Sequence, residues 1–252
     1  MVKETDLTLY GLIGFPLGHS WSAEWFNERF RRTGDFHKSY HLYPLEDIRE
    51  FPGLLHSQPL LGGLNVTIPY KEQVIPLLDE LDPEARAIGA VNTIRIYRVS
   101  GKPVTKGFNT DAPGFLQTLT PAMTSGRALV LGTGGASRAV AHALAGEAVP
   151  VTFVSRLKKG PGIISCQELT KEVMESHPLI VNATPIGMYP EIDDYPPIPY
   201  HFLNEGHFLY DLVYNPEITG FIKQGMLHGS MTMNGLQMLR NQAELAYEIF
   251  SR

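Results

Sequence analysis

The sequence predicts an α/β protein built as two units, and three observations support this fold class. Strand-like and helix-like segments alternate along the chain, as in proteins with mostly parallel sheets. A glycine-rich turn at residues 132–139 stands between a short apolar strand and a helix, which is the setting of dinucleotide-binding turns. The length of 252 residues favours two domains, each able to bury a core. We place the boundary near residue 110.

Composition narrows the class of protein further. Hydrophobic residues make up 43% and charged residues 19% of the chain, as in soluble globular proteins. A net charge of −5 gives no reason to expect nucleic acid or an anionic membrane as partner. No apolar run approaches the roughly 20 residues of a membrane span, and no signal-peptide segment precedes the first strand. The single cysteine, Cys166, excludes an internal disulfide and fits a reducing compartment, so we expect a cytoplasmic protein.

The first unit is expected to open with a strand at residues 7–13 and an amphipathic helix at about 23–32. A strand at 38–43 and a helix at 47–55 follow. Further along, we expect strands at 88–94 and 104–109, paired across Ser100-Gly101.

The stretch from Gly63 to Lys71 lies at the centre of this unit. It predicts a strand at 65–68 that runs into a helix from Pro69 to about residue 81, kinked at Pro76. Lys71 would then lie in the first helical turn, where the positive end of the helix dipole disfavours the ammonium form and lowers the lysine pKa. General-base chemistry needs such a lysine. For Lys71 taken alone, a surface lysine in an ordinary turn is the stronger interpretation.

The second unit opens with a strand at 127–131, the turn Gly132-Thr133-Gly134-Gly135-Ala136, a helix to about 146 and a strand at 149–155. Glycines let the backbone approach a pyrophosphate, and the helix N-terminus meets its charge. Ser137 stands where the fingerprint has its third glycine, so a glycine-rich turn without a nucleotide stays an alternative. Strands at 179–184, 208–213 and 230–233 follow, and then an apolar-striped helix at 237–250 on which Gln242 is the polar exception.

Five polar signals lie at the end of a strand or the start of a helix in this pattern. They are Ser20-x-Ser22, Asn65-Val-Thr67-x-Pro-x-Lys71, Gly89-Ala-Val-Asn92-Thr93, Asn109-Thr-Asp111 and Gln242. Singly they are weak, because Ser-x-Ser before a helix is usually an N-cap and Asn-Thr-Asp is usually a turn. Their joint occurrence predicts a ligand site at the strand ends, where open α/β sheets bind ligands.

These motifs resemble those of the shikimate dehydrogenase family over essentially the whole chain. The matching stretches are Gly11-Leu-Ile-Gly14, His19-Ser-Trp-Ser22, 65–71, 88–93, 109–111, 132–139, Asn182-Ala-Thr-Pro-Ile-Gly187, Asp211-Leu-Val-Tyr214 and Gly235-Leu-Gln-Met-Leu239 with Gln242. The resemblance implies a substrate domain of residues 1–109, completed by the C-terminal helix 236–252. It also implies a Rossmann-like NADP-binding domain of residues 110–235, with a cleft between the two.

The activity that the resemblance implies is the reversible NADPH-dependent reduction of 3-dehydroshikimate to shikimate, a step toward chorismate and the aromatic amino acids. Lys71 and Asp111 would be the catalytic pair: the lysine ammonium protonates the developing alkoxide, and the aspartate orients the amine and the reacting hydroxyl. The implied substrate contacts are Ser20, Ser22 and Tyr214 at the carboxylate end, and Thr67, Asn92 and Gln242, with the catalytic pair, at the ring hydroxyls. No metal is needed, because a positioned ammonium stabilises an oxyanion.

The cofactor contacts implied by the resemblance are Gly132, Thr133, Gly134, Gly135, Ala136, Ser155, Arg156, Leu212 and Gly235. Residues 155–159 read Ser-Arg-Leu-Lys-Lys, and three cations without an acid suit a 2′-phosphate, with Arg156 stacking on it or pairing with it. The family's usual triplet is Asn-Arg-Thr, so Ser155 and Leu157 are departures. A solvated basic loop is the competing interpretation of Lys158 and Lys159.

Only six residues separate Arg156 from Ile163, and Gly160-Pro161-Gly162 cannot be helical. A parallel crossover normally takes about a dozen residues and a helix. We therefore expect no helix here and loose binding at the adenosine end, with NADPH preferred over NADH by a smaller margin than in relatives that keep the helix.

Two other functions fit the same motifs. One is a sibling dehydrogenase that acts on quinate, and the absence of an acid after strand 149–155 argues against its NAD-using forms. The other is a non-catalytic binding protein that kept the fold, and the presence of both Lys71 and Asp111 argues against it. The expected partner is a small-molecule substrate, and the sequence leaves monomer and homodimer open.

Overall fold

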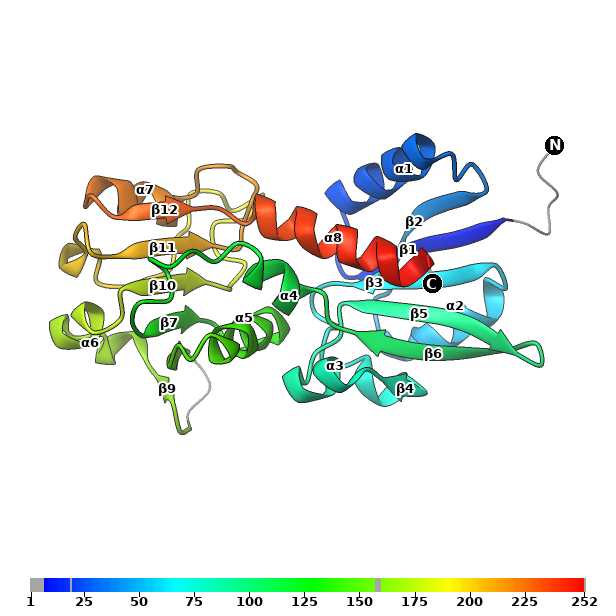
Figure 1. Ribbon diagram of the computed structural model, residues 1–252, viewed down its shortest axis with the longest axis horizontal. Helices are drawn as coiled ribbons and strands as arrows, with labels where there is room; N and C mark the ends of the chain where they lie inside the picture. The colour runs from blue at the N-terminus through cyan, green and yellow to red at the C-terminus, as the bar shows by residue number, and fades with distance from the viewer. Residues whose placement is uncertain (1–6, 19, 157–159, 252) are drawn as a thin grey trace. The chain divides into compact units, whose positions relative to one another are not determined.

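The computed structural model describes residues 7–18, 20–156 and 160–251, and the chain divides into two compact units. Unit 1 comprises residues 1–110 and 243–252, and unit 2 comprises residues 111–242. Each unit has one six-stranded sheet with helices, which confirms the predicted α/β class (Figure 1). Among the described residues, no helix is both long and apolar enough to cross a membrane.

Unit 1 forms a mixed sheet. Its elements are β1 (Thr8–Gly14), α1 (Trp21–Thr33), β2 (Lys38–Pro44), η2 (Ile48–Glu50), α2 (Phe51–Ser57), β3 (Leu61–Val66), η3 (Ile75–Leu77), β4 (Glu80–Leu81), α3 (Pro83–Ile88), β5 (Thr93–Val99) and β6 (Lys102–Phe108). The strand order is β2-β1-β3-β5-β6-β4. β1 runs parallel to β2 and β3, whereas β5 runs antiparallel to β3 and β6. β4 also runs parallel to β6, so three of the five strand pairs are parallel, and the expectation of mostly parallel sheets holds for this unit.

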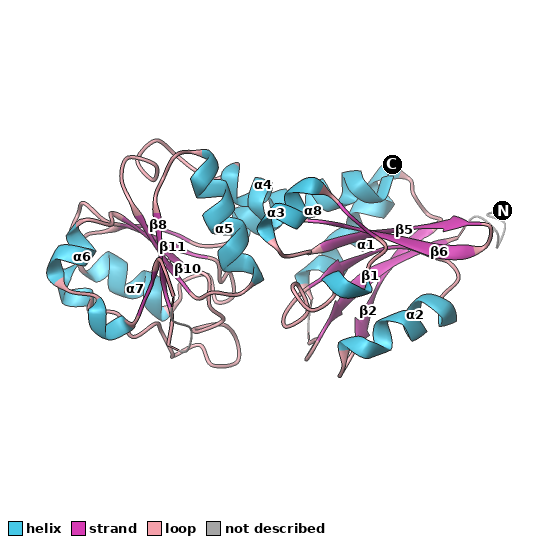
Figure 2. Cartoon of the chain, turned by 90° about the horizontal axis from the view of Figure 1, so that it is seen from below, coloured by secondary structure: helices cyan, strands magenta, loops and turns pink. Residues whose placement is uncertain are grey.

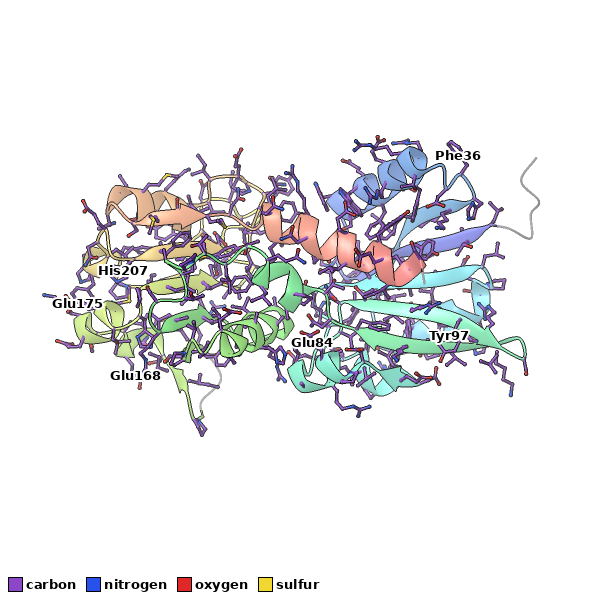
Figure 3. All side chains as sticks on the ribbon, in the orientation of Figure 1. Phe36, Glu84, Tyr97, Glu168, Glu175 and His207 are labelled. Atoms are coloured by element: carbon purple, nitrogen blue, oxygen red, sulfur yellow. The ribbon has the colours of Figure 1, made fainter. Side chains whose placement is uncertain are left out.

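The antiparallel part follows from one tight turn. β5 and β6 pair across Ser100 and Gly101, as the sequence predicted, and both residues have positive φ, at 51° and 81°. Such a turn matches the twist of a hairpin and forces the two strands to run in opposite directions. Tyr97 on β5, labelled in Figure 3, also donates a hydrogen bond to Glu80 Oε1 at 2.6 Å. Glu80 belongs to β4, so this bond links β5 to the edge strand.

Hydrophobic cores cover both faces of this sheet, because side chains alternate along a strand. Tyr10 and Leu12 of β1 belong to a cluster with α1 and the end of α8 (Leu236–Ser251). Ile13, the next residue, belongs to the opposite cluster with α2. Figure 2 shows α1 and α2 on either side of the strands.

The helix expected from Pro69 to residue 81 does not form. Residues 68–69 and 71–74 are turns, followed only by η3. The Lys71 carbonyl accepts from Val91 N–H at 2.7 Å, whereas an α-helix would need it for Ile75 N–H. Pro76 also lacks the N–H of a helical residue. Lys71 is therefore not at a helix N-terminus, and the dipole argument for a lowered lysine pKa does not apply.

The strand expected from residue 88 is also wrong at its start. Pro83 and Ile88 bound the short helix α3, which Asp82 caps by accepting from Glu84 N–H. Gly89 ends the helix with a positive φ of 70°, and β5 begins only at Thr93. Proline in the first helical turn and glycine just after the last are the usual ends of a helix.

Unit 2 is a doubly wound parallel sheet. Its elements are α4 (Asp111–Leu116), β7 (Ala128–Leu131), α5 (Gly135–Gly146), β8 (Val151–Val154), β9 (Ile163–Ile164), η4 (Cys166–Glu168), α6 (Lys171–Glu175), β10 (Leu179–Asn182), η5 (Tyr200–Phe202), β11 (Phe208–Asp211), α7 (Gly220–Leu227), β12 (Met231–Met233) and the first part of α8. The order β9-β8-β7-β10-β11-β12 is the 3-2-1-4-5-6 order of dinucleotide-binding sheets. α5 lies on one face, and α6 and α7 lie on the other (Figure 2).

The crossover from β8 to β9 is short, as expected. The two strands run parallel with Phe153 opposite Ile163, and none of the described residues between them, 155–156 and 160–162, is helical. Gly160 forms an isolated bridge with Ile163. Leu157, Lys158 and Lys159 lie outside the described residues, so the interpretation of that basic loop stays a prediction.

Candidate active site

The register of the unit 1 sheet brings four segments to one edge. Ile13 lies opposite Val66, Asn65 opposite Thr93, and Thr93 opposite Phe108. The ends of β1, β3 and β6 and the start of β5 therefore meet there. The predicted residues of unit 1 that follow or precede these strands are Ser20, Ser22, Thr67, Lys71 and Asn92.

Both serines belong to the start of α1. Ser20 is its N-cap and accepts from Ala23 N–H at 3.4 Å, whereas Ser22 is its second residue. Both side chains are half-buried. A helix N-terminus carries unpaired N–H groups and a positive partial charge, so this position suits a carboxylate ligand. His19, part of the same motif, lies outside the described residues.

Thr67 and Gly14 approach each other closely across the same edge. Thr67 N–H donates to Ile13 O at 2.9 Å, and Phe15 N–H donates to Ile68 O at 3.1 Å. A Cβ on Gly14 would lie only 2.4 Å from Thr67 Cγ2, so a side chain there would displace Thr67. Lys71 follows in the half-buried turn after Thr67.

Asn92 fixes the backbone that leads to Asp111. Its Oδ1 accepts from Thr110 N–H at 2.7 Å, and its Nδ2 donates to Thr110 Oγ1 at 2.9 Å. Asn92 and Thr110 are both 2% exposed. Asp111 is the next residue, buried at the start of α4 and assigned to unit 2. The side chain of Asn92 therefore helps to determine where α4 begins.

Asn65 also lies at this edge, although the resemblance assigned it no contact with the substrate. Its Oδ1 accepts from Tyr40 OH at 2.8 Å, and its Nδ2 donates to Thr93 Oγ1 at 3.1 Å. A signal for it was present, because Asn65 and Thr67 are two residues apart and strand side chains at i and i+2 share a face.

In unit 2, the glycine turn between β7 and α5 leaves its backbone open to close approach by a ligand. Gly132 has φ of +102°, and a Cβ there would lie 3.1 Å from both Ser137 Oγ and Thr184 Cγ2. A Cβ on Gly134, the N-cap of α5, would meet nothing within 4 Å. Ser137 Oγ is fully buried and has no hydrogen-bond partner among the described residues. The open turn, the orphaned hydroxyl and the helix N-terminus fit the pyrophosphate of a dinucleotide.

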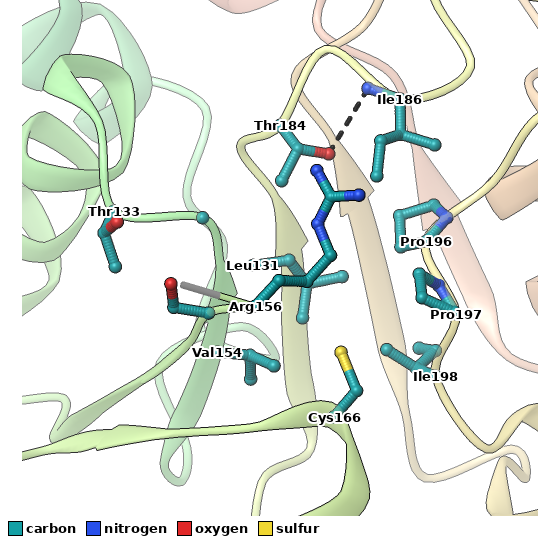
Figure 4. Close-up of a pocket in the computed structure, with 12 residues that line it drawn as sticks. Leu131, Thr133, Val154, Arg156, Cys166, Thr184, Ile186, Pro196, Pro197 and Ile198 are labelled. Carbon is teal, nitrogen blue, oxygen red and sulfur yellow. Dashed lines mark hydrogen bonds between the residues drawn. The ribbon is translucent and has the colours of Figure 1, made fainter. Parts of the chain in front are cut away.

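A pocket of about 220 Å³ adjoins this turn (Figure 4). The ends of β7 and β8 line it, and among the predicted residues Gly132, Thr133, Ser155 and Arg156 take part. Its far wall is apolar, with Ile186 and residues 196–198, and no lining residue in the described part of the chain is acidic. In Figure 4 the Arg156 side chain extends toward Thr184. An apolar slot with one cation suits an adenosine that carries a phosphate.

The ends of β10 and β11 are tied together by one buried carboxylate. Asp211 accepts from Asn182 Nδ2 at 2.9 Å, from Val213 N–H at 3.0 Å and from Thr219 Oγ1 at 2.6 Å. Burial raises the pKa of Asp211 to about 6 despite these three donors. Asn182 in turn accepts from Thr184 Oγ1 at 2.6 Å, so the Asp211 carboxylate supports a wall of the pocket.

Leu212 and Gly235 lie against each other beyond β11. Gly235 N–H donates to Val213 O at 3.2 Å, and a Cβ on Gly235 would lie 2.1 Å from Leu212 O, so only glycine fits. Tyr214 is half-buried, and burial raises its pKa. Gln242 donates to Leu239 O at 3.0 Å within α8. No group of three or more His, Cys, Asp or Glu side chains among the described residues could hold a metal ion.

Comparison with known proteins decides the family. The family model for the shikimate dehydrogenase substrate binding domain matches residues 12–94. The shikimate dehydrogenase (NADP(+)) of Desulforamulus reducens is 36% identical over 269 residues, covering 96% of this chain and 89% of the relative. The chain belongs to the shikimate dehydrogenase family.

Solved structures of that family share the whole architecture. Shikimate dehydrogenase from Aquifex aeolicus superposes with a TM-score of 0.84 at 32% identity, covering 99% of this chain and 94% of that one. The enzyme from Thermus thermophilus in complex with NADP(H) and shikimate gives a TM-score of 0.80 at 32% identity, with 97% and 94% covered. The matched residues 12–94 of the family model fall within unit 1, which holds Ser20, Ser22, Thr67, Lys71 and Asn92.

Proposed function

We propose that this chain catalyses the reversible NADPH-dependent reduction of 3-dehydroshikimate to shikimate. The observation that carries the proposal is the set of polar side chains that the unit 1 sheet gathers at one edge, in a chain whose full-length relatives are shikimate dehydrogenases. A small polyol acid needs many convergent donors and acceptors, and a site built from them strongly rejects analogues that lack a hydroxyl.

The substrate carboxylate is assigned to Ser20 and Ser22 at the N-terminus of α1, with Tyr214 at the same end of the substrate. The ring hydroxyls are assigned to Thr67, Asn92 and Gln242. This division is supported by charge, because the helix N-terminus favours an anion, whereas the amide and hydroxyl groups are neutral and offer both donors and acceptors.

Acid–base chemistry is assigned to Lys71 and Asp111. The Lys71 ammonium donates a proton to the substrate oxygen as negative charge develops on it, and Asp111 orients the ammonium and the hydroxyl that forms. Asp111 can hold a defined position because its backbone follows Thr110, which Asn92 clamps at both the N–H and the side chain.

Unit 2 is assigned the cofactor. Gly132, Thr133, Gly134, Gly135 and Ala136 hold the pyrophosphate at the N-terminus of α5, and Ser155 with Arg156 holds the 2′-phosphate. Leu212 and Gly235 are placed at the nicotinamide end. When bound, NADPH supplies the hydride. The domains proposed from these roles are a substrate domain of 1–109 with 236–252 and a cofactor domain of 110–235.

The test of this proposal is NADPH oxidation followed with 3-dehydroshikimate and, separately, with 3-dehydroquinate. Turnover with the first and little with the second is expected. Turnover mainly with 3-dehydroquinate would make the chain a quinate dehydrogenase. No turnover with either substrate would favour a non-catalytic binding protein that kept the fold.

Two further properties belong to the same proposal. A cytoplasmic location fits a chain with one cysteine, and a monomer or homodimer fits a substrate site that draws on this chain's residues alone. Light scattering on the purified enzyme distinguishes monomer from homodimer.

A further inference from the structure

A chain of buried hydrogen bonds runs behind Asn92, inside unit 1. Tyr40 OH lies 2.8 Å from Asn65 Oδ1, Asn65 Nδ2 lies 3.1 Å from Thr93 Oγ1, and Thr93 Oγ1 lies 3.2 Å from Asn92 Oδ1. Each of these four residues is at most 6% exposed. The site residue Asn92 is therefore connected, through two further side chains, to a tyrosine on a different strand.

The direction of every bond in this chain is fixed by backbone groups. Asn92 Oδ1 faces Thr110 N–H at 2.7 Å, and an N–H can only donate. Asn65 Nδ2 faces the Asn92 backbone carbonyl at 3.3 Å, which can only accept. The Asn65 amide therefore turns its oxygen toward Tyr40, and the phenol must be the donor. Burial raises the Tyr40 pKa well above its usual value, so the phenol keeps its proton.

Tyr40 is also tied to the helix that bears the two serines. Asn27 Oδ1 accepts from Tyr40 N–H at 2.9 Å, and Asn27 Nδ2 donates to Tyr40 O at 2.9 Å. β2 is an edge strand, so the Asn27 amide takes the place of a missing strand neighbour. Asn27 belongs to α1, whose N-terminus carries Ser20 and Ser22. One continuous set of hydrogen bonds thus connects α1 to Thr110.

We propose that Tyr40 is a positioning residue for substrate binding: its hydroxyl sets the orientation of Asn65 and, through Thr93, that of Asn92. The inference rests on the proposed function, because it takes Asn92 as a substrate ligand. Tyr40 itself is 3% exposed and stacks on Phe26, with ring centroids 4.5 Å apart and planes 5° from parallel. Its ring is held by packing, so the hydroxyl can be removed without moving the ring.

Tyr40→Phe removes that hydroxyl alone and leaves Asn65 Oδ1 buried without its donor. The amide then keeps only the contacts of its Nδ2 with Asn92 O and Thr93 Oγ1, so its orientation is less firmly held, and Asn92 presents a less well-placed group to the substrate. We expect the KM for shikimate to rise roughly fivefold to tenfold, the effect of one weakened polar contact. The KM for NADP and kcat should stay within about twofold, because the cofactor residues lie in unit 2.

Tyr10→Phe is the matched control. Tyr10 is 4% exposed, belongs to the same hydrophobic cluster as Tyr40 and donates to Phe250 O at 3.2 Å. It makes no bond to Asn65, Thr93 or Asn92 in the hydrogen bonds of the described residues. Both variants lose a buried phenol hydrogen bond and should lower the melting temperature similarly, but only Tyr40→Phe should change the KM for shikimate.

The same assay includes the unaltered enzyme and Asn92→Ala. Equal KM values for the two tyrosine variants, with Asn92→Ala impaired, would overturn the role of Tyr40 and leave the proposed function standing. An Asn92→Ala variant that binds shikimate normally would overturn the role of Tyr40 and the assignment of Asn92 as a ligand, but not the activity. No turnover of shikimate by the unaltered enzyme would overturn the proposed function as well.

Discussion

Ser20 and Ser22 share a proposed role but differ in what else their side chains do. Ser20 Oγ caps α1 by accepting from Ala23 N–H, whereas Ser22 is the second residue of the helix and does not cap it. A carboxylate remote from the reacting carbon is held about equally in ground and transition state, so its loss changes KM more than kcat.

We therefore expect Ser22→Ala to raise the KM for shikimate severalfold with kcat kept within a few-fold and the melting temperature unchanged. Ser20→Ala should raise KM similarly and also destabilise the fold by about 1 kcal/mol, the usual loss from an N-cap. Steady-state kinetics and thermal unfolding of both variants check this. A collapse of kcat at constant KM would place the serines elsewhere.

Arg156 is the cation of the unit 2 pocket, and its effect should depend on the cofactor. Arg156→Ala should raise the KM for NADPH about tenfold, the scale of a lost charged hydrogen bond, and leave the KM for NADH nearly unchanged. NADH, which lacks the 2′-phosphate, is the built-in control, and kcat should be spared. Unaltered NADPH affinity would remove Arg156 from the site.

At the residue scale, motif spacing predicted polar residues that the unit 1 sheet brings to one edge. The prediction that Lys71 lies at a helix N-terminus was wrong. The strand-to-helix pattern was sound locally, because Pro69 is well suited to a first helical turn. The competing interaction came from far along the chain, since Val91 N–H takes the Lys71 carbonyl. No window of sequence around Lys71 contains that information.

At the scale of elements, the carboxylate of Asp211 joins the ends of β10 and β11 and gives a pH-dependent contribution to stability. Its folded pKa of about 6 lies above the unfolded value near 4, so the folded state binds the proton more tightly. The contribution of Asp211 to the free energy of unfolding therefore increases as pH falls from about 6 to about 4. Above pH 6 the buried charge lowers the free energy of unfolding by at most about 3 kcal/mol.

Asp211→Asn keeps an oxygen that accepts from Asn182 and Val213 but removes the charge. The variant should lose the pH-dependent contribution of Asp211 to stability. When the pH is lowered from 7 to 4, its melting temperature should therefore rise less than that of the unaltered protein. Asp79→Asn is the control with the opposite sign: hydrogen bonds from Thr105 N–H and Oγ1 lower the Asp79 pKa, and its contribution is lost only at more acidic pH. Identical pH profiles for Asp211→Asn and the unaltered protein would contradict the assignment.

Elements differed in how well they could be predicted. The central strands of unit 2 were found because strands of a parallel sheet are buried on both faces, so they read as short continuous apolar runs. The short helices of unit 2 were missed, whereas the short helix α2 of unit 1 was predicted. α6 has five residues and only Met174 buried, too few for a helical period. α7 contains Gly225, a poor helix former that is needed because a Cβ would lie 2.8 Å from Thr232 Cγ2.

At the scale of the whole molecule, the proposed catalytic pair is divided between the units: Lys71 belongs to unit 1 and Asp111 to unit 2. The order of motifs along the chain predicted this pair, and the turn at Ser100 and Gly101 predicted the antiparallel hairpin, but neither gave the order of the strands in the sheet of unit 1. If the two groups act as one unit, the double variant Lys71→Ala/Asp111→Ala should be little slower than either single variant. Multiplied losses in kcat would show that they act independently.

The most direct test of the account is kcat for Lys71→Ala with NADPH and 3-dehydroshikimate, measured beside Lys106→Ala. Lys106 is a control lysine of the same unit, on β6, where it lies 3.8 Å from Glu80 Oε2. We predict that Lys71→Ala lowers kcat by a factor of roughly 10² or more, the scale of a lost general acid, with an unchanged melting temperature. Lys106→Ala should keep its activity. Near-normal turnover by a folded Lys71→Ala enzyme would contradict the central claim.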